Sequence, residues 1–292
     1  MKPATPKTAG QGNNLDPDTW ELFCTEIRSA NRFHLSGELA DFIDQVVASA
    51  ARRVRVIEEG EIAWRTRKGC RPSQDGPRPY VDDDIGAPPP ELAVAGRANP
   101  EGVPYLYLAS DYVTAIAEVR PWIEEQVSVG RFDALQDVRV VDATGGLFRG
   151  ITVTIKTPSS TRPGEYDKEY AADEDGNGFV TQTAEEKLWR SIDDAFSQPV
   201  SPPPSDNPSI YAPTQYLAER LKGEGYQGVA YKSALSSSGI NYVVFEPNLF
   251  RFKCSKIMWA KEITYKIADK KNGHAFYKSE VYDDPCLYLE VD

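Results

Sequence analysis

The sequence predicts an α+β fold: a mixed or antiparallel-rich β core with flanking helices and a helical region near the N-terminal end. Three observations predict this class. Short segments alternate apolar and polar residues. Successive segments of this kind often follow one another without an intervening helix of the length that a βαβ unit needs. Several other segments place apolar residues at helical spacing.

The N-terminal end is predicted to contain a disordered tail and two helices. Residues 1–15 are rich in Pro, Thr, Gly and Asn, a composition typical of disorder. Residues 16–33 follow with aromatic and aliphatic side chains on one helical face, and residues 37–53 repeat that pattern. We therefore expect a helical region over residues 16–53.

The remaining elements follow from alternation, capping and turn residues. Asp111 is a good N-cap for a helix that Pro121 ends, and 183-TAEE-186 fits a capping box. Asn272–Gly273 between two β-prone runs indicates a hairpin over residues 263–281. The strands are expected at 61–67, 105–109, 127–134, 137–144, 151–157, 228–234 and 240–247, and further helices at 184–196 and 213–225.

Composition excludes several classes of protein. The 292 residues carry a formal net charge of −11, which argues against direct nucleic-acid binding. Four scattered cysteines and two histidines, without a CxxC pair, give no basis for a metal site. No apolar run approaches the roughly 20 residues of a membrane span, and the first residues lack the apolar core of a signal peptide. We expect a cytoplasmic protein with no membrane association.

Four ordered blocks resemble the RES domain family: 64-WRTR-67, 97-RANPEGVPYLYLASDYVTAIAEV-119, 228-GVAYKSA-234 and 241-NYVVFEP-247. The resemblance implies an ADP-ribosyltransferase-like fold and an enzyme that degrades NAD⁺, usually a toxin neutralised by an antitoxin or immunity protein. It also implies a RES catalytic domain over residues 54–254, with an insertion at about 145–212, and it leaves residues 255–292 as a C-terminal β-hairpin extension. The residues carried over are Arg65, Arg97, Tyr107, Thr114, Glu118 and Ser233.

The chemistry of NAD⁺ cleavage suits these residue types. Breaking the nicotinamide N-glycosidic bond passes through an oxocarbenium-like state, which a carboxylate such as Glu118 stabilises. Arginine pairs with phosphate in a bidentate manner, so Arg65 and Arg97 suit the pyrophosphate, and Tyr107 offers an aromatic face. We expect catalytic roles for Glu118, Arg65 and Tyr107 and substrate-binding roles for Arg97, Thr114 and Ser233, with NAD⁺ as substrate and no metal.

Other interpretations stay open at the level of sequence. Arg65 fits a surface ion pair, and Glu118 fits a solvated helix face. The predicted activity is NAD⁺ phosphorylase or NAD⁺ glycohydrolase. The alternatives are a protein ADP-ribosyltransferase, or a non-enzymatic interaction module that binds a partner through residues 16–53 and the acidic surface.

Overall fold

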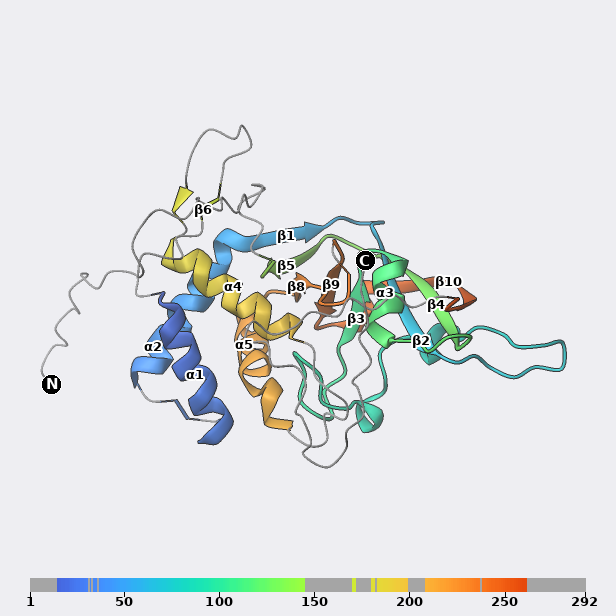
Figure 1. Cartoon of the computed structure of the whole chain (residues 1–292), viewed down its shortest axis with the longest axis horizontal. Coiled ribbons are helices and arrows are strands. Elements are labelled where there is room, and N and C mark those ends of the chain that lie inside the picture. Colours follow the sequence, from blue (N-terminus) through green and yellow to red (C-terminus); the bar gives the residue numbers. More distant parts are fainter. Residues whose placement is uncertain are drawn as a thin grey trace, which may run out of the picture.

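The fold is built on one eight-stranded mixed sheet, seen in the computed structural model of Figure 1. The structure describes residues 15–144 apart from 31, 33 and 36, then 170–171, 180–181, 183–198, and 208–261 apart from 237. The sheet strands are β1 (Val54–Ile57), β2 (Ile62–Lys68), β3 (Leu106–Ala109), β4 (Gln126–Ala134), β5 (Val138–Asp142), β8 (Gly228–Lys232), β9 (Ile240–Val244) and β10 (Phe250–Trp259). Their order is β1-β5-β8-β9-β3-β2-β4-β10, and β5 and β8 form a parallel pair among antiparallel neighbours. The predicted α+β class is confirmed.

The described helices begin and end close to the predicted limits. They are α1 (Pro17–Ser29), α2 (Gly37–Ser49), α3 (Tyr112–Val119), α4 (Ala184–Ser197) and α5 (Ala212–Gly223), and 3₁₀ turn η1 (Ala50–Arg53) extends α2. The Asp16 carboxylate caps α1 by accepting a hydrogen bond from Asp18 N at 3.2 Å. The capping box of α4 is formed, because the Thr183 and Glu186 side chains each accept a backbone hydrogen bond from the other residue.

The N-terminal helices share one core with the sheet. Figure 1 shows α1, α2, α4 and α5 gathered at one end of the molecule, with α3 apart from them. Phe23 of α1, Trp189 of α4 and Val243 of β9 are fully buried in the same cluster. Leu15, which was assigned to the disordered tail, is also buried there. The helices within residues 16–53 are therefore packed into the same body as the sheet.

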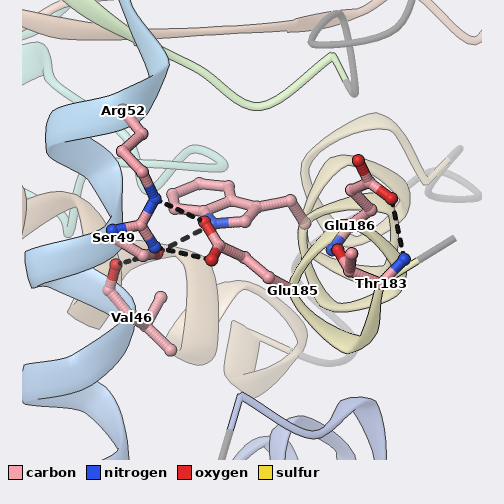
Figure 2. Close-up of polar contacts among 7 residues, drawn as sticks. Val46, Ser49, Arg52, Thr183, Glu185 and Glu186 are labelled. Atoms are coloured by element: carbon pink, nitrogen blue, oxygen red, sulfur yellow. Dashed lines mark hydrogen bonds and ion pairs between the residues drawn. The ribbon is translucent and has the colours of Figure 1, made fainter. Parts of the chain in front are cut away.

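Polar contacts fix the N-terminal helices on α4 (Figure 2). Arg52 makes a bidentate ion pair with Glu185, at 3.2 and 2.5 Å. In addition, the buried Trp189 indole donates to Ser49 Oγ at 2.9 Å, and Ser49 Oγ donates to Val46 O at 2.7 Å. The buried indole N–H thus has the partner that its burial requires.

The opposite face of the sheet has its own core. Ile85, from the loop after β2, lies fully buried among Leu106, Phe132 and Val244. This loop spans η2 (Asp82–Asp84) and η3 (Pro90–Leu92) and covers the sheet without a long helix. Ile85 packs closely on Gly130, because a Cβ at Gly130 would lie 2.8 Å from Ile85 Cδ1 and the Ile85 side chain would have to shift.

Strand β10 runs across residue 254, where the C-terminal domain boundary was predicted. No strand was predicted for residues 250–259, and the domain boundary after residue 254 falls inside β10. The strand pairs with β4 from Phe250 to Trp259, so it belongs to the main sheet. Its register shifts between Phe252 and Cys254, and this bulge interrupts the alternation that a sequence pattern needs. The 3₁₀ turn η6 (Pro247–Leu249) leads into it.

The sheet divides near its middle, and this division positions the site. Strands β2 and β3 pair at Trp64 and Ala109, after which β2 continues along β4 and β3 along β9. Helix α3 packs over β2, β3 and β4. The predicted strand 151–157 and hairpin 263–281 lie outside the described residues, and so does most of the insertion, apart from β6 (Tyr170–Ala171), β7 (Val180–Thr181), α4 and η5 (Pro208–Tyr211). In the described part of the chain, no helix is long and apolar enough to cross a membrane.

Candidate active site

A cavity of about 230 Å³ lies where β2 and β3 diverge. It is lined by Trp64, Arg65, Thr66, Tyr107, Leu108, Ala109, Ala115, Glu118, Tyr231 and Asn241. A larger cleft of about 400 Å³ lies at the start of β10, among Phe132, Phe250 and Phe252. The smaller cavity is the candidate active site, because Arg65, Tyr107 and Glu118, three of the site residues expected from the sequence, line it, and none of them lines the larger cleft.

Helix α3 carries Glu118 to this cavity. Asp111 starts the helix, its Oδ1 accepting a hydrogen bond from Thr114 N at 2.8 Å. The helix ends at Arg120, whose φ of 47° is left-handed, directly before Pro121. Glu118 therefore lies in the last turn of a short, well-defined helix.

The Glu118 carboxylate is held by two strands. Its Oε1 accepts one hydrogen bond from Ser233 Oγ and another from Asn241 Nδ2, each at 2.7 Å. Ser233 follows β8 and Asn241 lies in β9, so three distant segments meet at one oxygen atom. The interpretation of Glu118 as a solvated surface residue is wrong, since the side chain is half-buried and anchored.

Arg65 bridges the division in the sheet. Its Nη1 donates to the backbone carbonyl of Tyr107 at 2.8 Å. Its buried Nε has no partner among the described residues. Burial and the nearby Arg67 charge lower the pKa of Arg65 to about 10, so the guanidinium still carries its positive charge near neutral pH. The cavity wall thus includes a guanidinium cation whose Nε–H is still free to donate a hydrogen bond.

Tyr107 presents its ring to the cavity and its hydroxyl to a loop. The hydroxyl donates to Asn99 Oδ1 at 2.7 Å and accepts from Ala98 N at 3.1 Å. Burial raises the pKa of Tyr107, so the phenol stays protonated. Gly96 permits this contact, because a Cβ there would lie 2.6 Å from the Tyr107 hydroxyl oxygen. Tyr107 is therefore available for ring contacts more than for hydrogen bonding.

Arg97 and Thr114 do not line the cavity. Arg97 Nη1 donates to the carbonyls of Phe196 and Gln198 at 2.5 and 2.6 Å, at the C-terminal end of α4. Thr114 is fully buried, and its hydroxyl donates to Asp111 Oδ2 at 2.7 Å. Arg97 thus fixes the loop before β3 to α4, and Thr114 fixes the start of α3.

Among the lining residues that were not predicted as site residues, three have aromatic or amide side chains: Trp64, Tyr231 and Asn241. Trp64 stands in the first quoted block, and its ring meets Tyr112 edge-on at 5.8 Å. Buried Tyr231 stacks on Phe196 at 5.6 Å between ring centroids. Asn241 is a polar residue next to a run of apolar buried residues, and this contrast could have indicated a site residue from the sequence.

Comparison with known proteins decides the family. The sequence model of the RES domain family matches residues 62–267, most of the chain. The chain belongs to the RES domain family. RES proteins are in general NAD⁺-processing enzymes, and the mixed sheet with flanking helices of this RES protein agrees with the ADP-ribosyltransferase-like fold that the resemblance implied.

This RES protein is similar to a chain in the solved structure of the M. tuberculosis MbcT–MbcA toxin–antitoxin complex. The similarity covers 73% of this chain and 92% of that chain, at 16% identity and a TM-score of 0.39. No curated protein matches the chain at a significant level. Within the described residues, no group of three or more His, Cys, Asp or Glu side chains is placed to hold a metal ion.

Proposed function

We propose that this RES protein degrades NAD⁺ by cleaving the bond between nicotinamide and its ribose, with phosphate or water as acceptor. One observation carries the proposal: Glu118 is anchored at the wall of a cavity that also holds Arg65 and three aromatic rings. A fixed carboxylate beside flat apolar walls suits a planar cationic leaving group on a sugar.

The charge movement explains why a carboxylate is needed. When the glycosidic bond breaks, its electron pair leaves with the pyridinium nitrogen, and nicotinamide becomes neutral. The positive charge moves to the ribose C1′ and ring oxygen, as in glycoside hydrolysis. Glu118 lowers the energy of that cation electrostatically. An oxygen of phosphate or water then bonds to C1′, and a water acceptor loses its proton to solvent.

The cavity fits one end of the dinucleotide. Its volume of about 230 Å³ is below the roughly 300–1,000 Å³ of sites that enclose a whole drug-sized ligand. Trp64, Tyr107 and Tyr231 supply ring faces for the nicotinamide end, and Arg65 supplies a cation for a substrate phosphate. Ser233 acts through Glu118, while Arg97 and Thr114 act by fixing the loop and helix that form the walls.

The biological setting that we propose follows from the family. The protein acts as a RES-type toxin on the cytoplasmic NAD⁺ pool and is neutralised by an antitoxin or immunity protein. We expect such a partner to cover the mouth of the cavity. The formal charge of −11 makes a nucleic-acid target unfavourable.

Product analysis tests the proposed reaction. Purified protein is incubated with NAD⁺ with and without phosphate, and the products are separated by chromatography. Nicotinamide with ADP-ribose indicates hydrolysis, and nicotinamide with ADP-ribose 1″-phosphate indicates phosphorolysis. Transfer of the ADP-ribosyl group to protein would instead identify a protein ADP-ribosyltransferase, and absence of nicotinamide under all conditions would refute the proposal.

A further inference from the structure

Asn241 holds the same carboxylate oxygen as Ser233. Its Nδ2 lies 2.7 Å from Glu118 Oε1, and Ser233 Oγ lies 2.7 Å from that atom too. The Asn241 side chain is almost fully enclosed, and its residue is 5% exposed. Two neutral donors on one oxygen therefore fix the rotation of the carboxylate.

The backbone of Asn241 makes this donor rigid. The residue lies in β9, opposite Tyr231 of β8 on one side and opposite Ala109 of β3 on the other. Strand pairing on both sides leaves the side chain few alternative positions. Among the described residues, Glu118 Oε2 has no hydrogen-bond partner, so it is the oxygen left for a substrate.

We propose that Asn241 is a positioning residue that pins Glu118 Oε1 and thereby presents Oε2 to the ribosyl cation; this rests on the proposed function. An amide is suited to this task because it donates a hydrogen bond without bringing a charge or a titratable proton. The charged and titratable groups that line the cavity around this pair are Arg65 on β2, Tyr107 on β3, Tyr231 on β8 and Glu118 on α3.

Asn241→Asp provides the sharpest test, because it keeps the shape and replaces the donor with a second carboxylate. Two carboxylates at hydrogen-bond distance resist simultaneous ionisation, so the pair retains a shared proton to higher pH. We expect the acid limb of the kcat/KM profile for nicotinamide release to move up by about one pH unit or more. Relative to wild type, activity should fall as the pH decreases, by up to about tenfold for each unit of that shift, and should recover at higher pH.

Asn248→Asp is the matched control, since it adds the same charge at an exposed residue of η6 that does not line the cavity. Its profile should equal that of the wild type. Asn241→Ala is the second variant and removes the donor without adding charge. It should lower kcat about 10- to 100-fold, with KM nearly unchanged, because a positioned carboxylate acts mainly in the transition state.

Several results would overturn the inference. A wild-type profile for Asn241→Asp would show that the amide does not hold the working carboxylate. An equal loss of kcat/KM at every pH in a folded Asn241→Asp protein would indicate that Asn241 has a structural role alone. If Asn241→Asp does not fold, a wild-type kcat for Asn241→Ala decides against the inference. A wild type that releases no nicotinamide overturns the proposed function itself, and the inference with it.

Discussion

Replacing Asp193 with asparagine should stabilise the protein at neutral pH. The Asp193 side chain is 5% exposed, on the buried side of α4. It accepts a hydrogen bond from Lys232 N at 2.9 Å, and Lys232 Nζ is 3.8 Å from its other oxygen. Burial outweighs these contacts and raises the pKa of Asp193 to about 6.

The direction and size of this stability change follow from the linkage between protonation of Asp193 and folding. Because the folded pKa lies above that of the unfolded chain, the stability associated with Asp193 is fully present below about pH 4. It is lost as pH rises through about 6, by roughly 3 kcal/mol for a shift of about two units. An asparagine side chain at this position keeps an acceptor for Lys232 N and never ionises. Asp193→Asn should therefore gain up to roughly 3 kcal/mol at pH 7.5 and little at pH 4.

Denaturant unfolding at pH 4, 5, 6 and 7.5 measures this difference. Asp194→Asn is the control, since that neighbouring side chain is exposed. Its stability difference from wild type should not change with pH in the same way. An Asp193→Asn protein that is less stable than wild type at pH 7.5, or equally shifted at every pH, would refute the reasoning.

Three further substitutions distinguish residues that act on the substrate from residues that stabilise the fold. Ser233→Ala removes one donor to the Glu118 carboxylate, so kcat/KM for NAD⁺ should fall about 10- to 100-fold in steady-state assays; an unchanged value would contradict this role. Tyr107→Phe keeps the ring and loses the hydroxyl bond to Asn99, so denaturation should show a loss of about 1–3 kcal/mol with activity close to wild type; the reverse pattern would mean that the hydroxyl works on the substrate. Arg97→Met removes two bonds to the end of α4 and should cost about 1–3 kcal/mol in stability. If it instead weakens NAD⁺ binding at unchanged stability in calorimetry, Arg97 contacts the substrate.

Local signals accounted for the elements that the sequence predicted well. Helix α4 was recognised from its capping box at Thr183 and Glu186, and α3 from Asp111 at its start and Pro121 beyond its end. These devices act within one turn, so a single sequence displays them. Strand β10 lacked such a signal, because its bulge and three basic residues hide the alternation.

The site was only partly predictable, for a reason of geometry. The structure brings Arg65, Tyr107 and Glu118 to one cavity and places Ser233 against the Glu118 carboxylate, although the four residues come from separate segments. Arg97 has the same residue type as Arg65, yet its guanidinium binds helix carbonyls, since the fork that suits phosphate also suits clustered carbonyl oxygens. The order of the strands in the sheet determines which groups each arginine contacts, and local sequence patterns do not specify that order.

The most direct test of the central claim is nicotinamide release by Glu118→Gln in a single-turnover assay with enzyme in excess over NAD⁺. The glutamine side chain keeps the shape and an acceptor oxygen and removes the negative charge that stabilises the ribosyl cation. Release should slow by about 100-fold or more, while NAD⁺ binding changes little. A release rate equal to that of the wild type would show that the Glu118 carboxylate is not the catalytic group, and the mechanism proposed for this cavity would be wrong.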